Sequence, residues 1–599
     1  MCVSKKGLNM IELSSQPMSI QSIYSLYREG KLIVNRRYQR KLVWTLIEKQ
    51  KLIDSILNRY PIPAILIAEI EDKKGHFEII DGLQRLHALM SFIELAFKTT
   101  DEQFFNLDYF TTAKNYRDEG AFKTEEMTDQ KLLDSKQVSS ILDYMVAMST
   151  MRNVTEAQVN DVFDRINTYG HRLSDQERRQ AGIKNEFSDL VRTIACKLRG
   201  DVSDEVMELI KMPSVSVDLP LNKHGYGVSA EEVFWVKEGI LRSVDLRDSL
   251  DEQCIADIIA CIVGSKMISR SKEALDNIYT ESSEEFNRVE AALEVYGAEK
   301  LIDEFSFCVD EIQKSSSQKK LKEIVYKKKS SNPFPATFAV IFLAFHDLLI
   351  KSKKVISDYA GVESALENLS ERIKTTKDAG SPDERDKNVR SIKAQIEPFF
   401  VDTKDLKHVY GQHSTLDVNE LLRRSEIELA DYELKQGIMT LASSQRAIDE
   451  NAVKKIINSI CALANNGPNR VGKLLIGIAD EERDANRVQQ LDNVTPIKVG
   501  KKHVVGVKRE ATLLGKSVEQ YLALWRGRIR DSELSESLKT NVLSHMDYHD
   551  YYGLGVIIVT VIPQNQESYV GKKSYWRDGD ETKEITDFQQ HGVICARFK

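Results

Sequence analysis

The 599-residue sequence predicts an α+β multidomain protein. A chain of this length needs several cores, because single hydrophobic cores stop growing beyond about 250–300 residues. Short apolar strands alternate with helices at both ends, whereas residues 128 to about 400 have almost only helical periodicity. We therefore expect an α/β domain at 1–127, a mostly α-helical domain at 128–414 and an α+β domain at 415–599.

The first domain is predicted from alternating short elements. The pattern indicates helices at Ser19–Glu29 and Leu83–Phe97, and strands at Ala64–Ile70 and Phe77–Ile80. Pro61-Ile62-Pro63 marks a turn before the first of these strands. The order of elements is typical of an α/β or α+β unit.

Amphipathic stretches predict the helices of the middle domain. They lie at Ala157–Ile166, Asp175–Leu198, Ala230–Leu241 and Ser283–Leu293. The longest apolar run, Phe338–Phe345, is far shorter than the roughly 20 residues that cross a bilayer, so it indicates a buried helix.

The last domain is predicted from two apolar, β-branched runs. Leu474–Ala479 and Gly553–Ile562 have the composition of buried strands. Helices are expected between them and before them, at Ser517–Leu524 and Ala452–Ala464.

Charge and cysteine content limit the partners and the compartment. The net charge of −7 combines +5 over residues 1–100, +4 over residues 451–599 and −16 over the remainder, so phosphate contacts are expected at the ends. The seven cysteines include no Cys-x-x-Cys pair, which argues against a disulfide framework or a zinc ribbon. Sparse thiols and the lack of a secretory signal predict a cytoplasmic protein without a membrane partner.

One candidate site lies where a strand, a tight turn and a helix start meet, at Ile79–Arg85. Asp81 and Arg85 are four residues apart, so one helical turn brings both side chains to the same side of the helix start. A helix N-terminus offers N–H groups to an anion, an Arg can grip phosphate, and an Asp can hold Mg²⁺. Upstream, Arg37-Tyr38-Gln39-Arg40 adds cations and a ring. The pattern predicts a triphosphate site, with a purely structural helix cap as the alternative.

This part of the chain resembles the N-terminal domain family of the GmrSD-type, modification-dependent restriction proteins. The resemblance covers roughly residues 15–190 and implies a ParB-like fold, nucleotide hydrolysis and recognition of modified DNA. Leu83 stands where the family usually has a first Gln. Carried over by position, the resemblance implies a nucleotide site of Gln39, Arg40, Asp81, Gln84 and Arg85, with Asp81 catalytic. The residues that carry it are Tyr38-Gln39-Arg40, Val43-Trp44, Pro61-Ile62-Pro63, Asp81-Gly82-Leu83-Gln84-Arg85 and Phe163-Asp164-Arg165-Ile166-Asn167.

A second candidate site combines acidic residues around an apolar helix. If Tyr432–Gln436 is extended, Glu433 and Lys435 point to one face, and Asp480 follows a buried strand. Together with Glu428, these carboxylates can bind one or two divalent cations and activate water against a phosphodiester. Lys435 would stabilise the charge of the transition state. The alternative is a surface cluster in a chain with 91 acidic residues.

This region, about residues 425–599, resembles the AlbA-like domain of the Schlafen family. In nuclease members the resemblance implies Glu428, Glu433 and Asp480 as metal ligands and Lys435 as a catalytic partner, with Mg²⁺ or Mn²⁺ as cofactor. The sequence departs from the usual pattern of that domain in two places. Asn466–Gly472 replaces a compact Gly-Gly turn, and Ala442–Glu450 is an insertion. The matching features are Glu433-Leu434-Lys435, Ala464-Asn465, Gly472, Leu474-Leu475-Ile476-Gly477-Ile478 and Tyr575-Trp576-Arg577-Asp578-Gly579.

These features predict a prokaryotic anti-phage, restriction-type effector that couples binding or hydrolysis of a nucleoside triphosphate to metal-dependent cleavage of DNA or RNA. We expect Glu433→Ala to abolish cleavage while leaving folding intact. A second copy of the chain or a defence-system protein is a further expected partner. One alternative is a nucleotide switch acting with a separate nuclease. The other is a non-catalytic nucleic-acid-binding regulator, whose binding would use Lys473, Arg526, Arg528 and Arg530.

Overall fold

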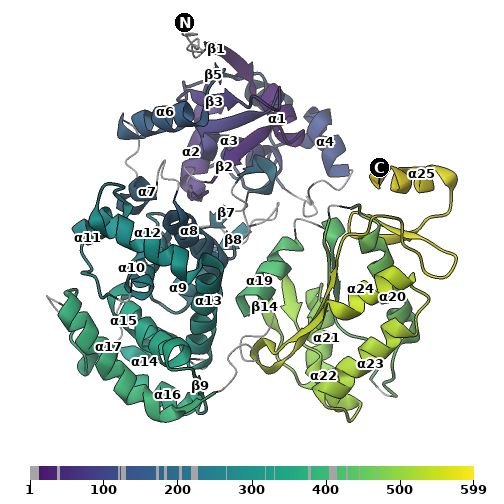
Figure 1. Ribbon diagram of the computed structural model, residues 1–599. Helices are drawn as coiled ribbons and strands as arrows, with labels where there is room; N and C mark the ends of the chain where they lie inside the picture. Colours follow the sequence, from purple (N-terminus) through teal and green to yellow (C-terminus); the bar gives the residue numbers. More distant parts are fainter. Residues whose placement is uncertain are drawn as a thin grey trace, which may run out of the picture. The chain divides into compact units, whose positions relative to one another are not determined.

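The chain divides into two compact units, residues 1–404 and 405–599, and each is described by itself (Figure 1). None of the helices in the described part of the chain is long and apolar enough to cross a bilayer. The computed structural model describes residues 12–36, 41–118, 122, 130–169, 174–180, 185–201, 206–212, 214–216, 227–264, 266–316, 319–328, 331–375, 379–403, 415–426, 429–443, 445–468 and 470–598.

The first unit begins with a mixed sheet in the strand order β1-β5-β3-β4-β2-β6. Pairing is parallel between β3 and β5 and between β2 and β4, and antiparallel elsewhere. Two of these strands come from beyond residue 127, so the sheet uses both sides of that predicted boundary. The strands are β1 (Glu12–Ser19), β2 (Leu32–Asn35), β3 (Ile65–Glu69), β4 (Phe77–Asp81), β5 (Met145–Arg152) and β6 (Val206–Glu208).

Helices bury their apolar sides against this sheet. Ile53 and Ile56 of α2 pack with Leu86 and Leu89 of α3 in one core. Thr45 caps α2, since its hydroxyl accepts from the Glu48 amide and the Glu48 carboxylate accepts from the Thr45 amide. The helices are α1 (Ile20–Arg28), α2 (Leu46–Leu57), α3 (Leu83–Ile93), α4 (Thr111–Asp118) and α5 (Ser135–Leu142).

The rest of the first unit is mostly helical. Its small strand pairs are β7 (Ser214–Ser216) with β8 (Gly227–Ser229) and β9 (Lys354–Ile356) with β10 (Phe400–Asp402). The apolar run Phe338–Phe345 lies within the buried helix α15. The helices are α6 (Glu156–Tyr169), α7 (Asp175–Gln180), α8 (Glu186–Arg199), α9 (Phe234–Lys237), α10 (Leu250–Val263), α11 (Lys272–Tyr279), α12 (Glu284–Tyr296), α13 (Ala298–Lys314), α14 (Leu321–Val325), α15 (Pro335–His346), α16 (Tyr359–Leu366) and α17 (Pro382–Ile396).

Two helix predictions in this region are wrong as continuous helices. Asp175–Leu198 is divided between α7 and α8, since Asn185 has an extended backbone, with φ −145° and ψ 160°, and caps α8. Ala230–Leu241 is not a continuous helix but a short 3₁₀ turn, Ala230–Glu232, followed by α9. Val233 between them has an extended backbone, with φ −69° and ψ 134°. The residues Val233–Val236 are all buried, so this stretch lacks the polar face of an amphipathic helix.

The second unit is built on a sheet in the order β11-β12-β17-β16, with β11 and β12 parallel and the other pairs antiparallel. The extended conformation expected at Tyr432–Gln436 is present as β11, and the runs expected as buried strands form β12 and β17. The strands are β11 (Tyr432–Lys435), β12 (Gly472–Ile476), β13 (Ile478–Ala479), β14 (Ile497–Val499), β15 (Lys502–Val504), β16 (Met546–His549), β17 (Val556–Val561), β18 (Tyr575–Asp578) and β19 (Glu581–Glu584).

Both faces of this sheet are covered. On one face, Leu474 and Val559 pack with Ile456 of α20 and Trp525 of α23. On the other, Leu475 and Ile558 pack with α19 and with the small sheet β13-β15-β14. The α+β multidomain prediction is thus confirmed at the level of the class. The helices are α19 (Thr415–Arg424), α20 (Glu450–Ala464), α21 (Glu482–Asp492), α22 (Lys508–Leu513), α23 (Val518–Arg530), α24 (Glu536–Ser544) and α25 (Phe588–Arg597).

Candidate functional site

The predicted site in the first unit lies at the junction of β4 and α3. Gly82 links them in a left-handed conformation, with φ +101°. A Cβ on this residue would lie 2.8 Å from Cγ1 of Ile65, so the turn favours glycine twice over. Gly82 supplies no side-chain cap to the helix. The Asp81 side chain is 43% exposed at this helix start.

Gln84 uses its amide to fix the backbone of a neighbouring segment. Its Oε1 accepts from the amides of Val43 (3.0 Å) and Trp44 (3.2 Å), and its Nε2 donates to the Lys41 carbonyl (2.6 Å). The side chain is buried, so these bonds are shielded from water. Gln84 is therefore a positioning residue for the chain that follows Gln39 and Arg40, which lie outside the described residues.

Arg85 holds a second segment in the same way. Its Nη1 donates to the carbonyls of Pro63 (2.6 Å) and Ala64 (3.0 Å), and its Nη2 donates to Oδ2 of Asp81 (2.7 Å). The guanidinium thus orients the Asp81 carboxylate and fixes the turn after Pro61-Ile62-Pro63. These three bonds use three of the five N–H donors of the guanidinium, so its main role in this structure is to position the two loops.

We expect Gln84→Ala to loosen residues 41–46. The substitution removes the partner of two amides and one carbonyl, and each buried polar group left unsatisfied costs about 1–3 kcal/mol. Hydrogen exchange of the full chain, followed by mass spectrometry, should show faster exchange in this peptide. Gln21→Ala, on the exposed side of α1, is the matched control. Unchanged exchange at residues 41–46 in Gln84→Ala would rule out the positioning role.

The same segment is tied to the helices by a buried ionic network. Nζ of Lys41 donates to Oγ of Ser249 (2.8 Å) and lies 3.4 Å from Oε1 of Glu252. Nη1 of Arg199 bonds the same Glu252 oxygen (2.8 Å) and Oδ2 of Asp251 (3.1 Å). Burial alone would raise the pKa of Glu252, but the charges of Lys41 and Arg199 hold it below its usual range. The loop held by Gln84 is therefore coupled to α8 and α10.

Lys49 is a buried cation that the sequence patterns did not single out. It lies in α2, and burial lowers its pKa to about 8. Burial and the Lys49 charge also lower the pKa of His87, in the second turn of α3. An anion beside a buried lysine favours its charged form, and shifted pKa values are common at functional sites, so Lys49 is a candidate anion partner.

In the second unit, the structure describes two of the three predicted metal ligands, since Glu428 lies outside the described residues. Glu433 is buried on β11, and its Oε2 accepts from Nη1 of Arg577, which comes from β18. Nη2 of Arg577 also donates to the Tyr432 carbonyl (2.9 Å). Lys435 forms an ion pair with the other Glu433 oxygen. The Glu433 carboxylate is thus held between two cations.

Asp480 lies in a more open setting. The chain leaves the main sheet at Gly477, where φ is +106° and a Cβ would lie 3.2 Å from the Gly506 backbone. It then forms β13 of the small sheet, which ends just before Asp480. The Asp480 side chain is 62% exposed and pairs with Lys502. Of the two described carboxylates, Asp480 is the more accessible to a metal ion.

Two of the basic residues considered for nucleic-acid binding already have internal partners. Nζ of Lys473 donates to the Thr560 hydroxyl (2.7 Å), and burial lowers the Lys473 pKa. Arg528 pairs with Glu450 at 2.7 Å. The ion pair offsets the charge of Arg528, and partial burial keeps the Lys473 amine from solvent, so both residues are less accessible to a phosphate backbone.

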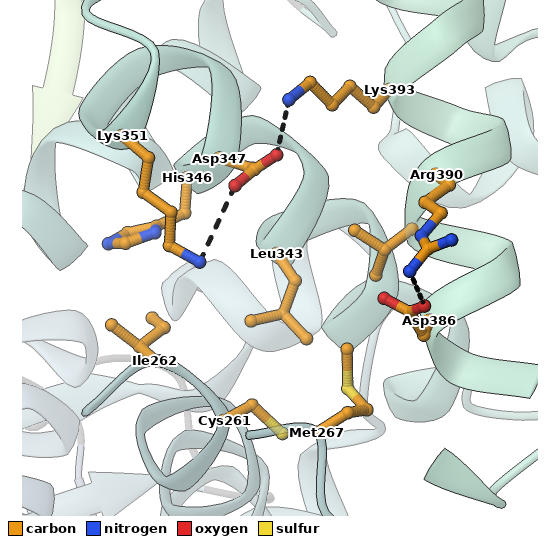
Figure 2. Close-up of a pocket in the computed structure, with 11 residues that line it drawn as sticks. Cys261, Ile262, Met267, Leu343, His346, Asp347, Lys351, Asp386, Arg390 and Lys393 are labelled. Atoms are coloured by element: carbon orange, nitrogen blue, oxygen red, sulfur yellow. Dashed lines mark hydrogen bonds and ion pairs between the residues drawn. The ribbon is translucent and has the colours of Figure 1, made fainter. Parts of the chain in front are cut away.

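A cavity of about 190 Å³ lies among the helices of the first unit. Figure 2 shows that Lys351 and Lys393 approach Asp347 from opposite sides, with Lys393 at 2.6 Å and Lys351 at 3.6 Å. Arg390 pairs with Asp386 at 2.6 Å. Each cation that lines this cavity, Lys351, Lys393 or Arg390, is paired with a carboxylate, Asp347 or Asp386, so the cavity does not resemble a preformed site for a charged ligand.

Comparison with known families supports one of the two resemblances. Residues 20–184 match the family model described as the GmrSD restriction endonuclease, N-terminal domain. The matched stretch covers less than half of the chain and includes the turn at Asp81 and the segments held by Gln84 and Arg85. The predicted N-terminal resemblance is thereby confirmed. No curated protein matches the chain. The Schlafen-like and ParB-like folds, the three-domain division and the site residues stay predictions.

Proposed function

We propose that the chain is a restriction-type, anti-phage effector. In this proposal the first unit binds or hydrolyses a nucleoside triphosphate, and the second unit cleaves nucleic acid with a divalent metal. The observation that carries the proposal is the GmrSD-type match over residues 20–184, within which the Asp81 turn presents a carboxylate at a helix start. A restriction endonuclease family implies nucleic acid as the partner.

The proposed nucleotide site is centred on Asp81. The N-terminus of α3 would bind phosphate oxygens, and Asp81 would hold Mg²⁺ or orient the attacking water. Gln39 and Arg40 belong to the same proposed site, at the end of the segment that Gln84 holds. Gln84 and Arg85 would contribute by keeping the two loops and Asp81 in place.

The proposed nuclease site uses Glu428, Glu433 and Asp480 around Mg²⁺ or Mn²⁺, with Lys435 facing the developing charge. GmrSD-type restriction nucleases are typically metal-dependent, which supports a metal in this role. Asp480 would exchange only its pairing with Lys502 for a metal. Glu433 would have to turn one oxygen away from Arg577 or Lys435.

Asp480→Asn is expected to abolish metal-dependent cleavage while leaving the fold intact, because the side chain is exposed and makes one ion pair. Purified full-length protein would be incubated with DNA and with RNA, with and without Mn²⁺ and a triphosphate. Asp580→Asn, an exposed aspartate of the same unit, is the matched control and should cleave like the wild type.

The same assay distinguishes the alternatives. Equal cleavage by the wild type and Asp480→Asn would remove Asp480 from the site. Salt-sensitive binding without any metal-dependent product would indicate a nucleic-acid-binding regulator. Nucleotide hydrolysis with neither nucleic-acid binding nor cleavage would indicate a switch that acts with a separate nuclease.

A further inference from the structure

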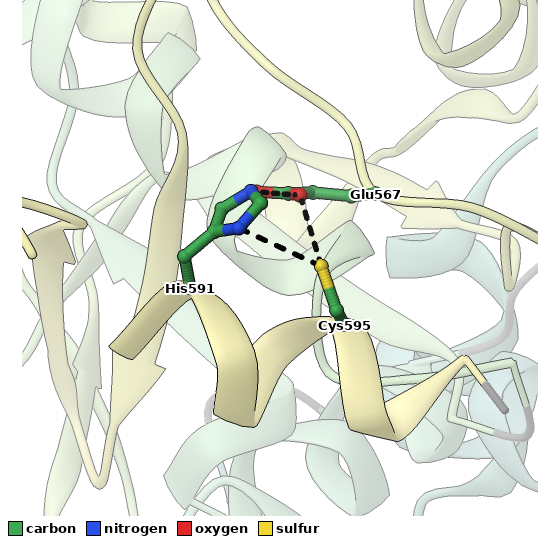
Figure 3. A group of neighbouring side chains, drawn as sticks. All are labelled: Glu567, His591 and Cys595. Atoms are coloured by element: carbon green, nitrogen blue, oxygen red, sulfur yellow. Dashed lines mark hydrogen bonds and ion pairs between the residues drawn. The ribbon is translucent and has the colours of Figure 1, made fainter. Parts of the chain in front are cut away.

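A cysteine, a histidine and a glutamate, none of them among the proposed nuclease residues, come together in the second unit. Figure 3 shows His591 and Cys595 side by side on α25 and Glu567 approaching from a loop. Nε2 of His591 lies 2.9 Å from Oε2 of Glu567, and Sγ of Cys595 lies 3.7 Å from Nδ1 of His591. Sγ of Cys595 also lies 3.9 Å from Oε2 of Glu567.

The surrounding structure holds both sides of this cluster. Asn465, which is fully buried, accepts from the Ser568 amide (2.8 Å) and donates to the Ser568 carbonyl (2.9 Å), so the residue next to Glu567 is fixed. The Asn465 carbonyl accepts from Nη1 of Arg597 (3.2 Å), which lies at the end of α25. Ile594 of the same helix is fully buried. Asn465, which directly follows α20, therefore holds both the loop that carries Glu567 and the helix α25.

We propose that Glu567, His591 and Cys595 bind a transition-metal ion, with Zn²⁺ as the best fit. Thiolate, imidazole and carboxylate are the three ligand types that Zn²⁺ takes in proteins. A thiolate in the set argues against Mg²⁺ and Ca²⁺, which bind oxygen ligands. His591 and Cys595 are four residues apart, so one helix face presents both ligands.

The spacing of the ligand atoms agrees with this assignment. One ligand atom from each residue can be chosen so that all three lie within 4.8 Å of one another. Tetrahedral Zn²⁺ with ordinary bond lengths separates its ligand atoms by roughly 3.4–3.6 Å. With Nδ1 of His591 as the ligand nitrogen, its distance to Sγ of Cys595 (3.7 Å) and the distance from Sγ to Oε2 of Glu567 (3.9 Å) are within a few tenths of an ångström of this range. Oε2 of Glu567 would exchange its contact with Nε2 of the same ring for the metal.

Glu567 has a second feature that points to a ligand. Its Oε1 is buried and makes no hydrogen bond to any described residue. A buried carboxylate oxygen in this state is costly, and coordination of the carboxylate would offset that cost. The His591 side chain is 51% exposed, which gives an ion a path from solvent. Three protein ligands leave a fourth position for water.

The proposed zinc is distinct from the proposed Mg²⁺ or Mn²⁺ of the nuclease site. It would join α25 to the loop between β17 and β18 and so stabilise the end of the second unit. Binding would require loss of the thiol proton, so affinity should rise with pH. The test of the proposed zinc site does not depend on cleavage of nucleic acid.

Cobalt is a suitable probe, because a thiolate bound to Co²⁺ gives a charge-transfer band in the near ultraviolet. Full-length protein freed of metal with a chelator would be titrated with Co²⁺ and then with Zn²⁺. We expect one Co²⁺ per chain with a thiolate band that Zn²⁺ abolishes. Cys595→Ser should lose the band, whereas Cys196→Ser, a partly exposed cysteine of the first unit, should keep it.

A second variant and a second readout distinguish loss of metal binding from misfolding of Cys595→Ser. His591→Ala removes an exposed ligand and should also lose the band, with circular dichroism like that of the wild type. Zn²⁺ should slow alkylation of Cys595 in the wild type but not in His591→Ala. A wild type without the thiolate band, or a band that persists in Cys595→Ser, would overturn the proposal.

Discussion

Glu433→Ala is expected to destabilise the second unit by about 3–5 kcal/mol, the usual cost of removing one partner of a buried ion pair. The Arg577 side chain is only 1% exposed and would lose the carboxylate that neutralises it. Its contacts with Tyr432 and Thr582 would remain but would not balance the charge. This replaces the expectation, drawn from the sequence, that Glu433→Ala leaves folding intact.

Hydrogen exchange in a denaturant series measures this effect within the full chain. Peptides covering β11, β12 and β18 should exchange faster in Glu433→Ala, while peptides of the first unit should not change. Glu433→Gln keeps the shape of the side chain and should lose less protection, and Asp480→Asn should lose almost none. If β11 were as well protected from exchange in Glu433→Ala as in the wild type, the ion pair with Arg577 would contribute little to stability.

This prediction changes how cleavage assays are interpreted. Loss of cleavage in Glu433→Ala would follow from unfolding as readily as from loss of a metal ligand. Asp480→Asn separates the two causes, because Asp480 is exposed and paired only with Lys502 among the described contacts. The nuclease proposal should therefore be tested at Asp480 first.

The elements that the sequence predicted well have strong local patterns. The cores of the two apolar runs, Leu474–Ile476 and Val556–Val561, became buried strands because apolar runs of this kind fit a sheet covered on both faces. The first run was predicted as one strand through Ala479, but it breaks at Gly477, and Ile478–Ala479 join the small sheet. The helix expected from Leu83 begins at that residue, where Gly82 forces the turn. Local propensity and burial agree in these segments, so the sequence alone suffices.

The contacts that define the candidate sites have no local pattern. Lys41 and Glu252 are buried together although about two hundred residues separate them. Glu433 and Arg577 both belonged to motifs noted in the sequence, but nothing in those motifs showed that they pair. Glu567 likewise meets His591 and Cys595 only through the fold, so the search for Cys-x-x-Cys pairs missed the cluster. Such pairings depend on topology, which single-sequence patterns do not encode.

Asp81→Asn is the second substitution with a large expected effect. A carboxylate that takes the proton of the attacking water contributes typically about 10²–10⁴-fold to a rate, and the amide would lose most of this. The fold should survive, because the side chain is 43% exposed and Arg85 keeps its bonds to Pro63 and Ala64. Asn also retains an oxygen that can accept from Arg85.

The most direct measurement is the release of phosphate from nucleoside triphosphates by the full-length protein with Mg²⁺. The wild type should hydrolyse at least one triphosphate, Asp81→Asn should be at least roughly 100-fold slower, and Asp72→Asn, an exposed aspartate in the turn before β4, should match the wild type. Equal rates for the wild type and Asp81→Asn would contradict the account. So would a wild type that neither binds nor hydrolyses any triphosphate.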